Sequence, residues 1–263
     1  MKSIYIRMII QIIFAGSFLF SFQSLNALWP ESAFTAKNVA DAMGNLFGTA
    51  DNTPSSKIKI EMPGSVDVGD RVPVKVSTAM AASDIAVLVE GNAQPLSANF
   101  NMGGSSKGTV AFNLKICGVS STDVIAVVKS GGKLYTARKN IKITSSDCTR
   151  YGPGRNITGG KSIQFRRAHV SGTDAYVKTK ILHPFETGLR IDPLTGSTVP
   201  AHYITEMKGE HKGTTIIIAQ WGPGVSGNPF FSFVFSGAYS GDIVKLTWVD
   251  NKGKSDSSEV KLK

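Results

Sequence analysis

The chain contains 263 residues, with 29 lysine and arginine residues against 19 aspartate and glutamate residues, which gives a formal net charge of +10. This excess of positive charge favours an anionic substrate or an acidic partner protein. Nucleic acid is not expected as a partner, because the basic residues form no run of five or more. The length suits two modest domains, each able to bury its own core.

The N-terminal segment has the pattern of an export signal. Lys2 and Arg7 precede an apolar stretch at residues 8–22, and residues 24–27 end in the small residue Ala27. The apolar stretch is shorter than the roughly 20 residues that span a bilayer, so we expect cleavage after residue 27. This predicts a signal peptide at residues 1–27 and a periplasmic protein that is not membrane-associated after cleavage. An uncleaved N-terminal anchor is the alternative.

The first half of the mature chain carries one predicted helix followed by strands. Apolar residues recur at helical spacing from Ala36 to Phe47, and Gly48 can end the helix. Short alternating segments between Pro, Gly and Asp turns predict strands at residues 57–61, 71–77, 84–90, 110–116, 123–129 and 133–144. This pattern is typical of a β-sandwich preceded by one helix.

A second series of strands follows a connector rich in glycine. We predict these strands at residues 175–182, 202–208, 214–220, 230–235, 242–249 and 257–262, with a tight turn at 250–253. The connector breaks the strand rhythm and suits an interdomain linker. The expected domains are therefore residues 28–148 and 162–263, joined by a basic linker at 149–161.

The second half resembles the SoxZ family, one subunit of a periplasmic carrier of sulfur compounds in thiosulfate oxidation. Five patches in order carry the resemblance, at residues 183–190, 200–204, 219–223, 228–229 and 248–253. The first half resembles the partner subunit, SoxY, more loosely, through residues 33–47, through 85–89 followed by 92–100, and through 133–137 followed by 141–144. The resemblance implies two immunoglobulin-like β-sandwich domains, the first preceded by one helix, paired inside one chain as a SoxY–SoxZ fusion.

The same resemblance implies a role for Cys148. In the SoxY family, a cysteine just after the last strand carries sulfur as a thiosulfonate or persulfide adduct, which partner enzymes process. Cys148 occupies the matching place here, which implies a carrier that is not itself an enzyme. The implied partners are periplasmic sulfur-oxidation enzymes and c-type cytochromes. The family's cysteine lies in a Gly-Gly-Cys-Gly-Gly tail, whereas residues 145–147 and 149–150 here contain no glycine, and glycine flanks give such an arm its flexibility.

Basic residues gather after Cys148. Between Thr149 and Thr173 there is no acidic residue, and nearby positive charge favours the thiolate and attracts anions such as thiosulfate. The candidate anion-attracting residues are Arg150, Arg155, Lys161, Arg166 and Arg167. Asp147 opposes this effect, and ordinary solvated linker charges are the alternative interpretation.

Cys117 is the only other cysteine, and it is the candidate resolving or disulfide partner of Cys148. A structural disulfide would close a loop of about 30 residues and stabilise the fold by about 3–4 kcal/mol in the chain-entropy picture. A reversible bond that protects or resolves a sulfur adduct is a second possibility. The structural disulfide belongs to a rival hypothesis, a non-covalent accessory protein of a quinoprotein dehydrogenase system, because such fusions also occur beside quinoprotein alcohol dehydrogenases.

The four histidines, His169, His183, His202 and His211, are scattered along the chain. None shows the spacing of a metal site, so neither a metal nor a cofactor is expected. No acid–base constellation accompanies the cysteines either.

Overall fold

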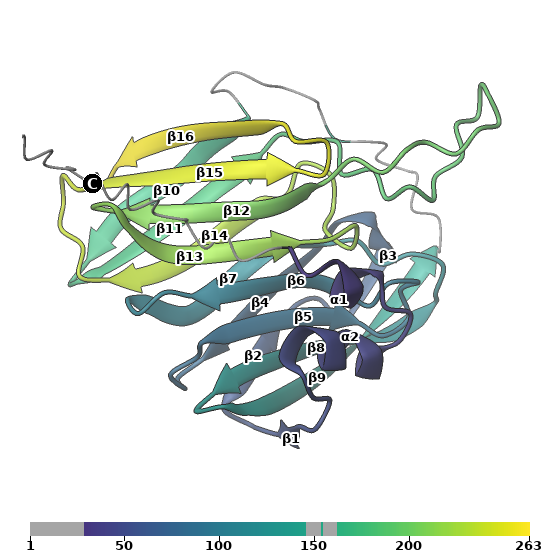
Figure 1. Ribbon diagram of the computed structural model, residues 1–263, viewed down its shortest axis with the longest axis horizontal. Coiled ribbons are helices and arrows are strands. Elements are labelled where there is room, and N and C mark those ends of the chain that lie inside the picture. The colour runs from purple at the N-terminus through teal and green to yellow at the C-terminus, as the bar shows by residue number, and fades with distance from the viewer. Residues whose placement is uncertain (1–28, 146–153, 155–161) are drawn as a thin grey trace, which may run out of the picture.

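The computed structural model describes residues 29–145, 154 and 162–263, which form a mainly β structure of two facing sheets (Figure 1). The predicted signal peptide and almost all of the predicted linker lie outside the described residues. The first sheet has ten strands, in the order β1 (Thr53–Pro54), β9 (Lys133–Ser145), β8 (Ser121–Ser130), β5 (Asp84–Val89), β6 (Leu96–Met102), β13 (Thr214–Trp221), β12 (Ile204–His211), β15 (Ile243–Asp250) and β16 (Ser255–Lys261), with β3 (Ser65–Val68) beside β9. The second has six, in the order β10 (Ile163–Ser171), β11 (Asp174–Ile181), β14 (Phe230–Ser236), β7 (Ser106–Leu114), β4 (Val72–Thr78) and β2 (Ile58–Glu61).

Both sheets continue from the first half of the chain into the second. Strand β6 pairs antiparallel with β13 in one sheet, and β7 pairs antiparallel with β14 in the other (Figure 1). The apolar faces between the sheets therefore form one core cluster, to which both halves contribute. The two sandwiches are joined edge to edge rather than by a flexible contact, which fixes the geometry of the junction.

Two short helices cover the outer face of the first sheet near β5 and β8, α1 (Glu31–Thr35) and α2 (Val39–Phe47) (Figure 1). Asn38 caps α2 by accepting a hydrogen bond from the backbone N–H of Asp41 at 2.8 Å. Gly48 ends it with φ 81°. The predicted helix is thus confirmed. Helix α1 was not predicted, because five residues are too few to show a helical period.

Every segment predicted as a strand forms one, with ends that shift by a few residues, and the mainly β prediction is confirmed. Strand β6 was not predicted, although it forms the join to the second half. Strand β7 ends at Leu114, so Cys117 lies in the connection that follows it. No helix in the described ranges is long and apolar enough to cross a bilayer.

Candidate functional site

Cys117 is disulfide-bonded. The chain's other cysteine, Cys148, lies outside the described residues. The backbone around Cys117 is held by the side chain of Asn92, which donates to the carbonyl of Lys115 at 2.8 Å and accepts from the N–H of Cys117 at 3.2 Å. These two hydrogen bonds hold the backbone of Cys117 in place and so fix the position of its side chain.

Gly69 approaches the same segment from the other side. Its carbonyl accepts a hydrogen bond from the N–H of Ile116 at 2.7 Å. A Cβ atom at Gly69 would lie 2.0 Å from the carbonyl oxygen of Ile116, so only glycine permits this approach. The Cys117 segment is therefore positioned by three hydrogen bonds, two with the side chain of Asn92 and one with the backbone of Gly69.

A cavity of about 560 Å³ opens beside Cys117. We call it the junction cavity, because both halves of the chain line it. Its lining residues are Asn92, Ala93, Gln94, Lys115, Cys117 and Gly118 from the first half and Thr187, Leu189, Arg190, Ile191, Pro223 and Gly224 from the second. The backbone N–H of Lys115 donates to the carbonyl of Gly224 at 2.7 Å, which joins the two walls. A group attached at this cysteine would have a partly apolar chamber beside it.

The junction cavity carries positive charge on both walls. Burial lowers the pKa of Lys115 from its ordinary value, although the charges of Glu186 and Asp70 oppose that shift. Arg190 is paired with Glu186, whose carboxylate lies 3.1 Å from the arginine Nε, and this hydrogen bond raises the pKa of Arg190. Because Arg190 is already paired, Lys115 is the cation better able to meet a bound anion.

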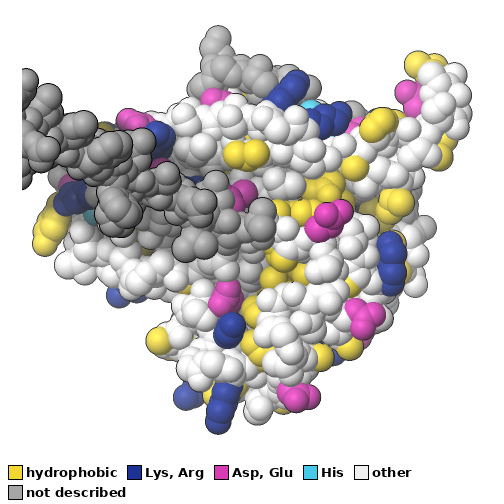
Figure 2. Space-filling view, viewed as in Figure 1, with side chains coloured by type: hydrophobic (Ala, Val, Ile, Leu, Met, Phe, Trp, Pro, Cys, Tyr) yellow, Lys and Arg dark blue, Asp and Glu magenta, His cyan; other side chains and the backbone are white. Residues whose placement is uncertain are grey.

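One wall of the cavity belongs to a long loop at residues 183–203, which we call the rim loop. It projects from the body of the molecule (Figure 1), and Figure 2 shows apolar side chains at its far end. Leu189 and Ile191, which line the cavity, are 69% and 55% exposed, and Leu194 is 93% exposed. At the base, Glu186 and His202 exchange backbone hydrogen bonds of 2.9 Å.

The base of the rim loop also holds a buried polar cluster. The Nε2 atoms of His183 and His202 lie 3.3 and 2.8 Å from the same oxygen, Oδ2 of Asp250. Sequence reasoning missed this cluster because the three residues are far apart in the chain. The one signal was indirect: each residue lies in a different patch of the SoxZ resemblance.

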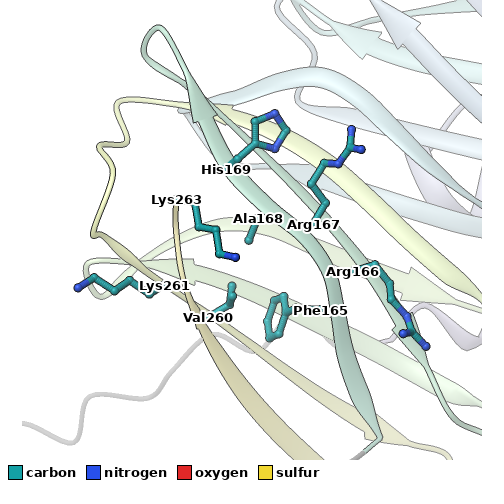
Figure 3. Close-up of a pocket in the computed structure, with 8 residues that line it drawn as sticks. All are labelled: Phe165, Arg166, Arg167, Ala168, His169, Val260, Lys261 and Lys263. Carbon is teal, nitrogen blue, oxygen red and sulfur yellow. The ribbon is translucent and has the colours of Figure 1, made fainter.

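The predicted anion-attracting residues do not gather at the junction cavity as far as the structure describes them. Arg150, Arg155 and Lys161 lie outside the described residues. Arg166 and Arg167 lie on β10, where they border a different hollow between β10 and β16. Figure 3 shows their side chains diverging, while Lys263 points towards Phe165 and Val260 in that hollow.

Comparison with known families places this chain in the class of sulfur oxidation proteins. Residues 43–148 match the model of the sulfur oxidation protein SoxY, and residues 163–261 match that of the sulphur oxidation protein SoxZ. The two matches follow each other along the chain without overlap. The chain therefore belongs to these two families as a fusion, with a SoxY unit in front of a SoxZ unit.

Solved structures add three likenesses. The sulfur carrier protein SoxY from Chlorobium limicola f thiosulfatophilum is 31% identical, covers 43% of this chain and 98% of its own, and has a TM-score of 0.37. The BSP domain of a biofilm associated protein is 9% identical, with 88% and 33% covered and a TM-score of 0.26. The Parabacteroides merdae β-glucuronidase is 11% identical, with 79% and 24% covered and a TM-score of 0.25. Among curated proteins, no match was found.

Proposed function

We propose that this protein is a periplasmic carrier that holds thiosulfate-derived sulfur covalently on Cys148 and presents it to partner enzymes. We further propose that Cys148 is the disulfide partner of Cys117 in the resting form. The observation that carries this proposal is that Cys117, on the wall of the junction cavity, is disulfide-bonded in a chain with one other cysteine. The SoxY match, which extends to residue 148, supports the proposal that Cys148 is the carrier residue.

Loading then needs no separate oxidant. The terminal sulfur of thiosulfate attacks Sγ of Cys148, a new sulfur–sulfur bond forms, and the Cys117–Cys148 bond breaks. Its electron pair leaves on Cys117 as a thiolate, so the disulfide is the group that is reduced. Lys115 lines the same cavity, and a nearby cation stabilises a leaving thiolate. The reverse attack by Cys117 would release thiosulfate and restore the disulfide.

The cavity suits protection of the cargo rather than catalysis. The described residues that line it include two cations, one of them paired, and apolar side chains from the rim loop. Such a chamber can cover a sulfur adduct and meet its anionic end. Chemistry on the adduct is left to partners, which we propose are periplasmic sulfur-oxidation enzymes and c-type cytochromes.

The test is the intact mass of the mature protein after incubation with thiosulfate, followed by alkylation and peptide mapping. We expect one thiosulfate to be added to the Cys148 peptide and Cys117 to become open to alkylation. Cys148→Ser should abolish the adduct, while Cys117→Ser should still accept sulfur when an external disulfide activates Cys148. A wild-type protein that gains no mass, with both cysteines resistant to alkylation, would disprove the carrier proposal.

A second candidate function rests on the same disulfide. If the bond is purely structural, the protein would serve as a non-covalent accessory protein of a quinoprotein dehydrogenase system. The disulfide-bonded state of Cys117 favours this candidate as well. Inertness towards thiosulfate, together with a quinoprotein gene beside this one and no sulfur-oxidation genes, would select it.

A further inference from the structure

The cluster at the base of the rim loop presents three metal-binding atoms to one point. His183, His202 and Asp250 each offer one ligand atom, and these three atoms lie within 4.8 Å of one another. Zinc bonds to histidine nitrogen and carboxylate oxygen at about 2.0–2.2 Å in a tetrahedral array, which places ligand atoms about 3.4 Å apart. The separation of 3.3 Å between Nε2 of His183 and Oδ2 matches that spacing, whereas the 2.8 Å between Nε2 of His202 and Oδ2 is a hydrogen-bond distance that would lengthen on coordination.

The side chains of this cluster are held in orientation by their surroundings. Oδ1 of Asp250 accepts the backbone N–H groups of Lys252 and Lys254, both at 2.9 Å, so Oδ2 faces the histidines. The ring of His183 packs edge-on against Trp248, with centroids 5.4 Å apart. All three side chains are buried, with 2%, 6% and 3% exposure for His183, His202 and Asp250. Fixed outer contacts of this kind orient metal ligands in proteins.

We propose that His183, His202 and Asp250 form a zinc site, with water as the fourth ligand. Two neutral imidazoles and one carboxylate are a ligand set that suits zinc. The set has three ligands from three segments: His183 begins the rim loop, His202 lies at its other end, and Asp250 lies at the end of β15.

Another histidine–aspartate pair in the same protein provides a comparison. Nε2 of His211 lies 2.9 Å from Oδ2 of Asp242, but within the described part of the chain no second histidine joins them. Nζ of Lys212 lies 3.0 Å from Oδ1 of the same aspartate, where it neutralises the carboxylate. The His211 pair therefore shares the hydrogen bond of the proposed site, but the described residues offer it no third ligand.

Zinc binding changes the proton positions in a definite way. Without metal, both Nε2–H groups donate to Oδ2 of Asp250, and Nδ1 of His183 accepts from the N–H of Phe185 at 3.3 Å. Coordination through Nε2 would leave each ring proton on Nδ1. The N–H of Phe185 must then move away from His183. Phe185 has φ 50°, and its ring centroid lies 5.8 Å from that of Trp221, so tryptophan fluorescence can report the shift.

Zinc at this site would hold the rim loop in place and so fix one wall of the junction cavity. Because the three ligands come together only in the folded chain, zinc would stabilise the fold by binding to that state alone. It would tie both ends of the rim loop to β15, and this loop supplies Leu189, Arg190 and Ile191 to the cavity wall. This inference does not depend on whether Cys148 carries sulfur.

The test uses tag-free, fully oxidised protein, since thiols and affinity tags bind zinc themselves. After equilibration with zinc chloride and desalting, we expect one zinc per chain by elemental analysis. Chelator competition should show that His202→Gln and Asp250→Asn weaken affinity by more than about 100-fold, the upper range for loss of an outer contact. His211→Gln is the matched control and should bind zinc as the wild type does.

Two outcomes overturn the proposal: wild-type protein that retains no zinc, or His202→Gln that retains it as tightly as the wild type. Circular dichroism checks that each variant folds. If a variant does not fold, wild-type protein loaded with Co²⁺ decides the matter. Intense absorption bands of tetrahedral Co²⁺ with nitrogen ligands support the site, and the weak spectrum of hydrated Co²⁺ contradicts it.

Discussion

The ring of Phe100 stacks on the ring of Phe231, with centroids 5.8 Å apart and an interplanar angle of 9°. The two residues come from different halves of the chain, on β6 and β14, and both are fully buried. Trp221 extends the contact, with its centroid 5.4 Å from that of Phe231. The SoxY and SoxZ units thus share one aromatic core rather than two separate ones.

Removing this ring should therefore destabilise both halves together. We expect Phe231→Ala to lower the free energy of unfolding by about 3–5 kcal/mol, the usual cost of truncating a buried aromatic side chain. Denaturant unfolding followed by tryptophan fluorescence and far-ultraviolet circular dichroism should give one coincident transition. Two separated transitions in the wild type would show that the units unfold independently, contrary to a shared core.

Gly69 should be needed for the position of Cys117. Gly69→Ala places a Cβ atom 2.0 Å from the carbonyl oxygen of Ile116, so the segment of Lys115 to Cys117 must shift. We expect lower thermal stability and faster reduction of the disulfide by a small thiol. Gly64→Ala is the matched control, because nothing lies within 4 Å of a Cβ atom there. Equal reduction rates in both variants would mean that the Gly69 contact does not position the cysteine.

Much of the fold could be predicted from the sequence because its strands alternate. Phe231, Phe233 and Phe235 face the core in turn, and the residues between them are less buried. Strand β6 lacks such a clear pattern: Ser97 and Asn99 are buried along with their apolar neighbours, because helix α1 and the second half cover this strand. The side-chain amide of Asn99 donates to Gln220 at 3.0 Å, a partner that local sequence cannot reveal.

The candidate site could be predicted only in part, for a similar reason. Cys117 is visible as one of two cysteines, but the junction cavity combines four loops that are distant in sequence. His183, His202 and Asp250 also meet only through the pairing of β12 with β15 and the closure of the rim loop. Spacing rules identify sites on one helix or hairpin, and neither of these sites has that form.

Asp242 should make the fold sensitive to acid. Its pKa is lowered to about 2, first by the hydrogen bond from the backbone of Tyr239 and then by Lys212 and His211. A carboxyl group whose pKa is lowered by folding stabilises the native state at any pH above its ordinary pKa. That contribution is lost as the pH falls from about 4 towards 2. We expect Asp242→Asn to be less stable than the wild type at pH 6, with the difference shrinking towards pH 2. Urea midpoints across this range provide the measurement.

The control for this pH dependence is Asp51→Asn, which changes an exposed carboxylate. Its urea midpoint should follow that of the wild type across the whole range. If Asp242→Asn keeps a constant difference from the wild type down to pH 2, ionisation of Asp242 is not what stabilises the native state.

Lys115 should lower the stability of the fold while it supplies positive charge to the junction cavity. Burial lowers its pKa, so the unfolded chain binds the lysine proton more tightly than the folded chain, and wild-type stability should rise as the pH increases towards 10.5. Lys115→Met should be more stable than the wild type at pH 7 and lack this rise.

Lys115→Met should also form the thiosulfate adduct more slowly, because no cation remains there to stabilise the leaving thiolate of Cys117. Lys133→Met, at an exposed position, should change neither property. Faster or unchanged adduct formation in Lys115→Met would remove Lys115 from the proposed loading step, even if the stability change is observed.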